Sequence, residues 1–94
     1  MSFEEMYENR IKFIDDLFIS VHCSIDKMPK FGINENDIEK IYKKGKLYIS
    51  KCEKPNKISI SLYNGKKRTT QVIVVRFGYD HVRVVTVWEQ KGKL

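Results

Sequence analysis

The N-terminal half of the chain carries apolar residues at helical spacing. Ser2 and Glu5 have the spacing of a capping box, in which each side chain satisfies a free amide of the first helical turn. Apolar residues then recur every three or four positions, which predicts an amphipathic helix of about four turns that ends near Asp16. A short extended segment is expected over 17–21, and a second clear helix over 35–44.

Beyond residue 45 the apolar pattern changes to a period of two, which is typical of strands. Strands are predicted over 47–50, 58–63, 69–77 and 82–88. The Asn64-Gly65 pair is typical of a two-residue hairpin turn, because both of its positions must take positive φ. Helices followed by a four-stranded antiparallel β-meander predict an α+β fold, in which the N-terminal helices pack on one face of the sheet.

The turns determine which side chains share a face, because alternate residues of a strand point to opposite sides. A two-residue turn at 64–65 places Ser61 opposite Arg68. A four-residue turn over 78–81 places Arg76 opposite Arg83. Thr86 falls on the face that the helices should cover, together with Ile58, Ile60, Leu62, Ile73, Val75, Phe77, Val82 and Val84. The second face is predicted to be bare and collects Ser59, Ser61, Tyr63, Lys66, Arg68, Thr70, Arg76 and Arg83, with Val72, Val74, Val85 and Val87 between them.

Composition limits the class of protein. Ninety-four residues, 41% of them hydrophobic, suffice for one domain over 1–94. No apolar run is long enough for a membrane span, and the first residues lack the pattern of a signal peptide. Cys23 and Cys52 are too few for a disulfide framework or a zinc site. We therefore expect a cytoplasmic protein without a metal, a cofactor or a membrane partner.

The formal charge of +6 is divided unevenly along the chain. Residues 1–39 hold four basic and nine acidic side chains, a net charge of −5, whereas residues 40–94 hold fourteen basic and three acidic ones, a net charge of +11. A basic half of this kind predicts RNA or another polyanion as partner, although an ordinary solvated face would also be rich in Lys and Arg. The predicted nucleic-acid-binding residues are Tyr63, Lys66, Lys67, Arg68 and Arg76.

The sequence contains no glycine-rich phosphate loop, no metal-ligand spacing and no serine-triad motif. If the chain is an enzyme, acid–base chemistry with cationic charge stabilisation is the accessible route, and RNA cleavage by its own 2′-hydroxyl needs no more than that. The candidates are His22 or His81 for proton transfer and, for charge stabilisation, Lys27, Arg68, Arg76 and Arg83. Both histidines also have an ordinary structural interpretation.

Five short segments follow one another along the chain: Phe18-Ile19-Ser20-Val21-His22, Lys27-Met28, Lys30-Phe31-Gly32-Ile33, a helix over 37–44 and Val84-Val85-Thr86-Val87-Trp88. This order resembles a family of small bacterial domains that is grouped with RelE-like toxins in the barnase–EndoU–colicin–RelE nuclease fold. The resemblance covers about 17–90 and leaves the helix of 1–16 outside it, as an added arm. It implies catalytic roles for His22, Lys27, Arg83 and Thr86.

Two functions follow from these patterns. The first is an RNA-binding, toxin-type domain that acts, if it is catalytic, as a metal-independent endoribonuclease through its basic sheet face. The alternative is a non-catalytic binding protein, such as an immunity protein, an antitoxin or a phage-type inhibitor. Lys27 and Trp88 favour the alternative, because they stand where the family commonly has an arginine and a tyrosine. An acidic antitoxin or immunity protein is a further expected partner of the toxin-type domain.

Overall fold

The computed structural model describes residues 2–94, and its first helix begins at the predicted capping box. The backbone amide of Glu5 donates to Ser2 Oγ at 3.1 Å, and the Ser2 amide donates to Glu5 Oε1 at 3.2 Å. The helix α1 (Phe3–Asn9) continues as a 3₁₀ helix, η1 (Arg10–Asp16). The predicted end near Asp16 is therefore confirmed, although the second half of the segment is more tightly wound than an α-helix.

The sheet has five strands, in the order β1 (Leu17–Ile19), β5 (Val82–Lys91), β4 (Thr69–Phe77), β3 (Lys57–Asn64) and β2 (Lys46–Leu47). The expected α+β class is confirmed, but the four-stranded antiparallel sheet is not, because β1 adds a fifth strand that runs parallel to β5. The extended segment predicted over 17–21 supplies this strand. A parallel partner lies far away in sequence, so that the local pattern could not show the pairing.

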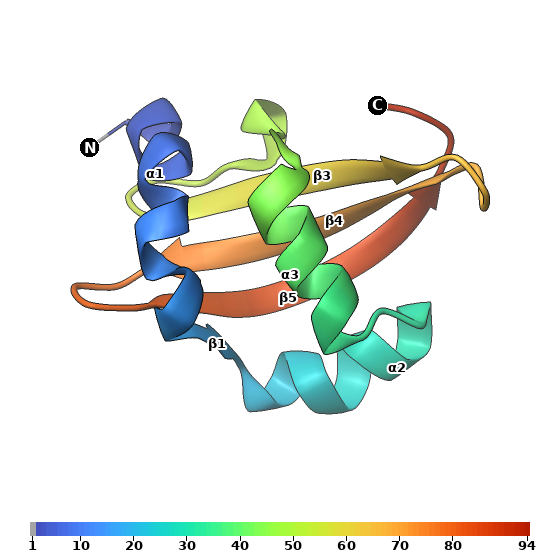
Figure 1. Cartoon of the computed structure of the whole chain (residues 1–94), viewed down its shortest axis with the longest axis horizontal. Coiled ribbons are helices and arrows are strands. Elements are labelled where there is room, and N and C mark those ends of the chain that lie inside the picture. Colours follow the sequence, from blue (N-terminus) through green and yellow to red (C-terminus); the bar gives the residue numbers. More distant parts are fainter. Residues whose placement is uncertain (1) are drawn as a thin grey trace.

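The remaining helices lie between β1 and β3 in sequence. They are η2 (Cys23–Lys27), a π-helix, followed by α2 (Met28–Phe31), α3 (Glu35–Lys44) and the short 3₁₀ helix η3 (Ile49–Lys51). Figure 1 shows that α1 and α3 lie side by side on one face of the sheet, whereas α2 lies beyond its β1 edge. Within residues 2–94, no helix is long and apolar enough to cross a membrane.

The register of the β3–β4 hairpin differs from the predicted one. Asn64 pairs with Thr69, so that four residues form the connection, and Ser61 lies opposite Val72 instead of Arg68. The Asn64 side chain closes the longer turn, since its Oδ1 accepts hydrogen bonds from the backbone amides of Lys66 and Lys67. The shift amounts to four residues, an even number, so each β3 residue keeps its predicted face. The predicted second-face residues Lys66 and Arg68 lie in the turn.

The β4–β5 pairing is confirmed at its turn end and altered beyond it. Arg76 lies opposite Arg83, as predicted, but the register then shifts by one residue at a bulge in β5. The inserted residue is Val85, and every residue after it changes face. Thr86 therefore lies on the second face, contrary to the prediction, and Val87 is buried in the core at 1% exposure.

The core lies between the helices and the face that they cover. Six of the eight apolar strand residues predicted for this face are buried in it, and Leu62 and Phe77 pack against it while partly buried. Helices α1 and α3 contribute Met6, Ile38, Ile41 and Tyr42. The second face is not bare along its middle, because Ser59 and Thr70 are buried. The Ser59 hydroxyl donates to the Lys51 carbonyl at 2.9 Å and that of Thr70 to the Gly92 carbonyl at 2.6 Å. Consequently, η3 and the C-terminal tail close over this face from two sides.

Reciprocal hydrogen bonds tie the first helix to α3. Arg10 Nε donates to the Tyr42 carbonyl at 2.7 Å and Arg10 Nη2 to the Lys43 carbonyl at 3.1 Å. In return, the Tyr42 hydroxyl donates to the Arg10 carbonyl. The guanidinium also lies 3.7 Å from the centroid of the Tyr7 ring. Since Met6 is buried in the same core, α1 and η1 pack as part of the domain and do not extend from it as an arm.

Arg10→Ala should lower the free energy of unfolding by about 2–4 kcal/mol, because it removes charged hydrogen bonds to carbonyls at the end of α3. Chemical denaturation followed by circular dichroism measures this change. Lys12→Ala, at an exposed position of the same 3₁₀ helix, is the control and should change stability by less than about 0.5 kcal/mol. Equal losses in the two variants would contradict the stabilising role of these hydrogen bonds.

Candidate functional site

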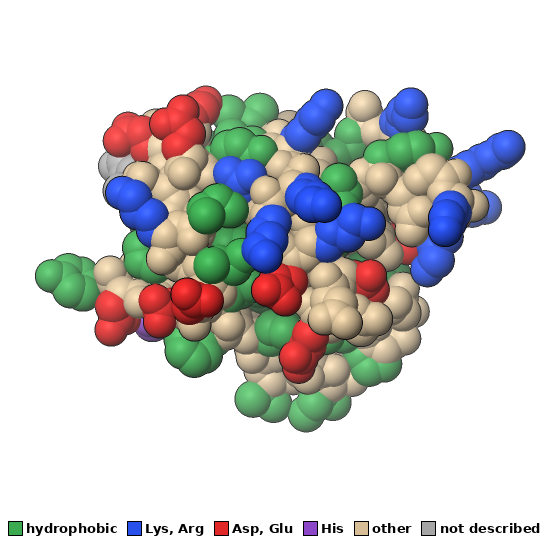
Figure 2. All heavy atoms as spheres, in the orientation of Figure 1, with side chains coloured by type: hydrophobic (Ala, Val, Ile, Leu, Met, Phe, Trp, Pro, Cys, Tyr) green, Lys and Arg blue, Asp and Glu red, His purple; other side chains and the backbone are tan. Residues whose placement is uncertain are grey.

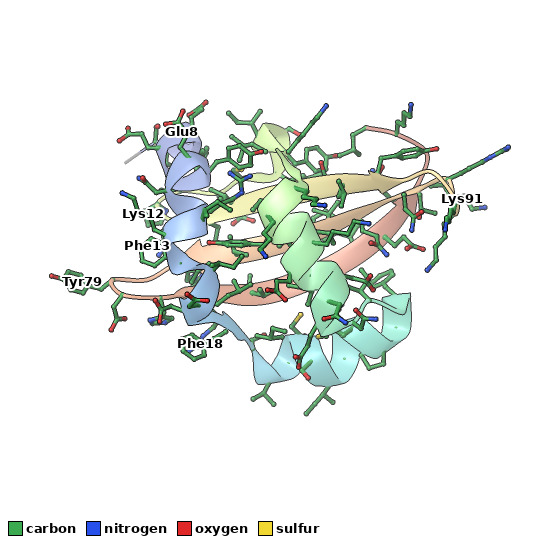
Figure 3. The ribbon with its side chains drawn as sticks, in the orientation of Figure 1. Glu8, Lys12, Phe13, Phe18, Tyr79 and Lys91 are labelled. Carbon is green, nitrogen blue, oxygen red and sulfur yellow. The ribbon has the colours of Figure 1, made fainter. Side chains whose placement is uncertain are left out.

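Basic side chains gather where the β3–β4 turn meets the C-terminal tail. The amide of Gly92 donates to the Arg68 carbonyl at 2.9 Å, which holds the tail against the turn. We call this region the basic end and define it by Lys66, Lys67, Arg68, Lys91 and Lys93. Figure 2 shows basic side chains at this end of the molecule and along α3, and Figure 3 labels Lys91 there.

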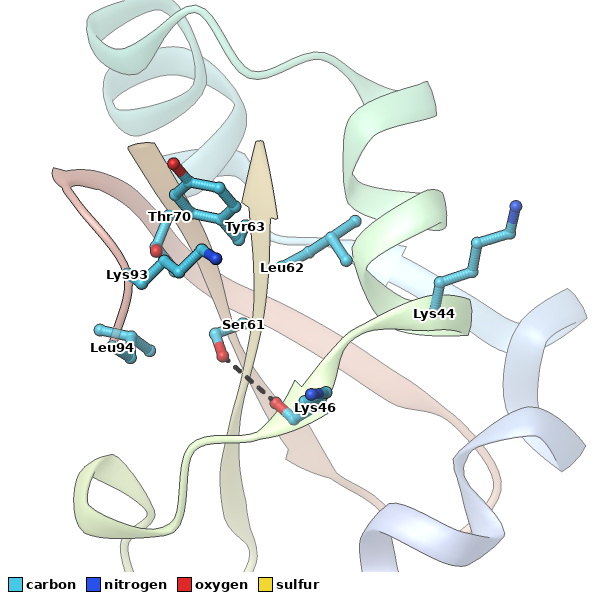
Figure 4. A pocket seen from close by; sticks show the side chains of 8 residues that line it. All are labelled: Lys44, Lys46, Ser61, Leu62, Tyr63, Thr70, Lys93 and Leu94. Carbon is cyan, nitrogen blue, oxygen red and sulfur yellow. Dashed lines mark hydrogen bonds between the residues drawn. The ribbon is translucent and has the colours of Figure 1, made fainter. Parts of the chain in front are cut away.

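A cavity of about 380 Å³ lies beside the basic end (Figure 4). Tyr63, which is 37% exposed, forms one wall, and Lys93 Nζ lies 5.1 Å from the centroid of its ring. The full lining consists of Lys44, Lys46, Ser61, Leu62, Tyr63, Thr70, Lys93 and Leu94. Three lysines and no Asp or Glu side chain therefore line this cavity with an aromatic ring at the edge of the sheet.

Tyr63 also borders a second cavity, of about 550 Å³, on the side of α3. Lys40 and Lys66 line this cavity together with Asp37. Tyr63 borders both cavities at the edge of the sheet, where β2 pairs with β3 only at Ser61 and Ile60, and Lys93 Nζ lies over one face of its ring. The structure thus brings four of the five predicted nucleic-acid-binding residues together at one end: Tyr63, Lys66, Lys67 and Arg68.

Arg76, the fifth of these residues, lies at the opposite end of β4, beside Arg83. Both arginines line a cavity of about 270 Å³, whose other lining residues are Ser20, Asn56, Phe77, Gly78, His81 and Val85. His81 Nδ1 lies 2.8 Å from Asp80 Oδ1. This hydrogen bond from His81 is the main reason why the pKa of the Asp80 carboxyl is lowered from its ordinary 3.8.

The four predicted catalytic residues fall into separate groups. Lys27 is the last residue of η2 and His22 is its N-cap. His22 Nε2 is 3.6 Å and Lys27 Nζ 4.0 Å from the same carboxylate oxygen of Asp26. The His22 side chain is 71% exposed. No hydrogen bond or ion pair within residues 2–94 joins either residue to Arg83 or Thr86.

Arg83 instead lines one cavity with His81 and Arg76. The sequence names all three as candidates and predicts the pair of arginines, but it does not predict that His81 lies beside them. His81 was a candidate for proton transfer, but its position in a predicted turn favoured a structural role. The informative signal was the turn length, since a four-residue turn places Arg76 opposite Arg83 and His81 two residues before Arg83.

Metal and thiol chemistry find little support in the described part of the chain. Residues 2–94 contain no group of three or more His, Cys, Asp or Glu side chains that could hold a metal ion. Burial raises the pKa of the Cys23 thiol. Burial also raises the pKa of the Cys52 thiol. Both cysteines are therefore disfavoured as thiolate nucleophiles.

Comparison of the chain with protein-family models, with curated proteins and with solved structures found no match.

The Asp80 carboxyl should titrate below pH 3.8, which a pH series of carboxyl ¹³C shifts by NMR measures. Because the folded pKa is lowered, the carboxylate favours the folded state above its ordinary pKa, and this effect is lost as the pH falls through the lowered value. His81→Ala should return the pKa of Asp80 towards 3.8. The pKa of Glu5, which the Ser2 hydrogen bonds lower at another site, is the internal control and should not change. An unchanged Asp80 in His81→Ala would contradict the contact.

Proposed function

We propose that this protein binds single-stranded RNA at its basic end. The observation that carries the proposal is the cluster of cations around an accessible tyrosine ring. Within residues 2–94, no ion pair reaches any cation of the basic end, so these charges remain available to phosphates. Tyr63 offers a ring on which an unpaired base can stack, which favours single strands over duplexes.

The conformation of Arg68 supports this proposal. Its φ of 55° is in the left-handed region, which glycine adopts more readily than any residue with a Cβ atom. A strained arginine in an exposed turn indicates that the side chain serves a purpose other than folding. Phosphate binding would supply that purpose, since the planar guanidinium can donate two parallel hydrogen bonds to one phosphate group.

The proposal is limited to binding. Cleavage of RNA would need a base, an acid and a cation around one phosphate, and the predicted residues His22 and Lys27 are not grouped with Arg83 and Thr86.

A second candidate function is the binding of a protein, as in the immunity or antitoxin alternative. Phe18, Val21 and Ile25 favour it, because all three are more than half exposed near the β1 edge. Contacts through such apolar side chains would depend little on salt, whereas phosphate contacts weaken steeply with it. Deletion of the first helix would not test this candidate cleanly, since Met6 belongs to the core.

Binding to a fluorescent oligoribonucleotide should weaken as salt rises, because every neutralised phosphate releases counterions. For five contacts at the basic end, the slope of log K against log salt should be about −3.5. The double substitution Lys66→Gln and Lys67→Gln should make the slope less steep by about 1.4. Fluorescence anisotropy at several salt concentrations measures both values.

The matched control removes two positive charges elsewhere, by Lys12→Gln and Lys54→Gln. Lys12 lies on η1, and Lys54 lies against the Phe3 ring of α1, away from the tail and the turn. This variant should keep the slope of the unmodified protein. If the two double variants changed the salt slope equally, only net charge would matter, and a site at the basic end would be contradicted. Stronger binding to DNA of the same sequence would contradict the assignment to RNA.

Arg68→Gly should stabilise the fold and weaken RNA binding at the same time. Relief of the left-handed strain should raise the free energy of unfolding by about 0.5–1 kcal/mol, and loss of the guanidinium should lower affinity. Denaturation and anisotropy measure the two effects on the same protein. Arg68→Lys, which keeps the charge and the Cβ atom, should change stability little. A variant with glycine that binds RNA as tightly as the arginine form would remove the functional reason for the strain.

A further inference from the structure

We infer that the β4–β5 turn end of the sheet is a second, separate anion site, and that Arg76, Arg83 and His81 bind a phosphate ester group there. This inference does not depend on RNA binding at the basic end. The two regions lie at opposite ends of β4, which runs from Thr69 to Phe77 and spans roughly 26 Å at the rise of an extended strand.

The arginine pair is the first observation. Arg76 and Arg83 are directly opposite each other on neighbouring strands and therefore lie on the same face. Like charges in such a pair repel, with Cβ atoms typically about 5 Å apart, unless an anion lies between them. Both side chains are exposed, and within residues 2–94 neither forms an ion pair with a carboxylate. A phosphate between the two guanidinium groups would remove the repulsion and accept hydrogen bonds from both.

The fixed ring of His81 is the second observation. Because Nδ1 faces the Asp80 carboxylate at 2.8 Å, an Nδ1 proton is donated to that carboxylate and Nε2 is the nitrogen left to face a ligand. Nε2 donates a hydrogen bond to a phosphate oxygen when the imidazole carries protons on both nitrogens. A Cβ atom on Gly78 would lie 3.1 Å from His81 Cε1, so the ring packs on this glycine. On another side, the Phe18 ring meets the imidazole edge-on, with the centroids 5.6 Å apart.

The cavity itself has the chemistry and the size for a phosphate ester. Its lining includes both arginines and His81 but no carboxylate, while Asp16 and Asp80 line the adjoining groove next to Phe18. The Ser20 oxygen accepts a hydrogen bond from the Cys23 amide at 3.1 Å, which leaves the hydroxyl proton for a ligand. A volume of about 270 Å³ is slightly below that of typical small-molecule sites and suits a phosphate group with its ester linkage better than a whole nucleotide.

The test begins with inorganic phosphate and the full chain, at constant ionic strength. NMR of the backbone amides and the arginine side chains should show saturable shifts at Arg76, Arg83 and His81. Arg83→Gln should weaken phosphate binding at least tenfold, and Arg83→Lys should weaken it less, because it keeps the charge but not the paired donors. Amide spectra that match the unmodified protein confirm that these variants fold, as expected for an exposed side chain.

Two controls separate this site from the basic end. The Lys66→Gln and Lys67→Gln double variant should bind inorganic phosphate as the unmodified protein does, even if its RNA binding is lost. Gly78→Ala should weaken phosphate binding without a change of charge, because the new methyl group would lie 3.1 Å from His81 Cε1 and push the ring aside by a few tenths of an ångström. Absence of saturable shifts at the three residues, or binding that survives Arg83→Gln, would overturn the inference whatever the result with RNA.

Two oligoribonucleotides of one sequence, with a 5′-phosphate or a 5′-hydroxyl, then identify the source of the phosphate. Preference for the 5′-phosphate that disappears in Arg83→Gln would assign the site to the end of an RNA strand. Equal binding of the two, together with saturable binding of inorganic phosphate, would assign it to a small phosphate compound. Both results support a phosphate site and differ only in what occupies it.

Discussion

The pairing of β5 with β4 connects the two candidate sites of this protein. At one end of the ladder it places Arg76 opposite Arg83, and at the other it places Lys91 opposite Thr69, at the start of the turn that carries the basic residues. Between the two ends, the inserted Val85 reverses the faces of all later residues of β5. The core therefore receives Val87, and the second face receives Thr86 and Trp88. The β4–β5 pairing, with its single bulge, thus runs from one candidate site to the other and determines which side chains lie on the surface between them.

The helices complete the domain from one side only. Arg10 and Tyr42 exchange hydrogen bonds with each other's backbone, so that the first helix and α3 cover the same sheet face as a unit. The second face is covered by less regular elements, η3 and the C-terminal tail, which meet the buried hydroxyls of Ser59 and Thr70. Because η3 and the C-terminal tail cover only the middle of this face, its two ends stay accessible, and both candidate sites lie at those ends.

Local features of the structure could be predicted from the sequence, and long-range pairings could not. The Ser2 cap and the end near Asp16 depend on neighbouring residues and were predicted, as were the faces of β3 and the Arg76–Arg83 pair. The parallel partner of β1 and the bulge at Val85 depend on contacts between distant segments. The four-residue turn depends on how the Asn64 side chain binds the following amides. Of the candidate sites, the basic end follows from composition, whereas the grouping of His81 with two arginines becomes visible only once the turn is folded.

The uneven division of charge along the chain becomes a separation in space, because the acidic first helix and the basic turn occupy different ends of the sheet. Glu8 marks one of these ends and Lys91 the other, along a molecule whose longest extent is 34 Å. This separation of charge gives the molecule an electric dipole along its length. A polyanion approaching from solution would rotate it before contact, so that productive collisions are more frequent than random orientation allows. The arrangement of charge therefore acts on the rate of encounter as well as on the strength of the complex.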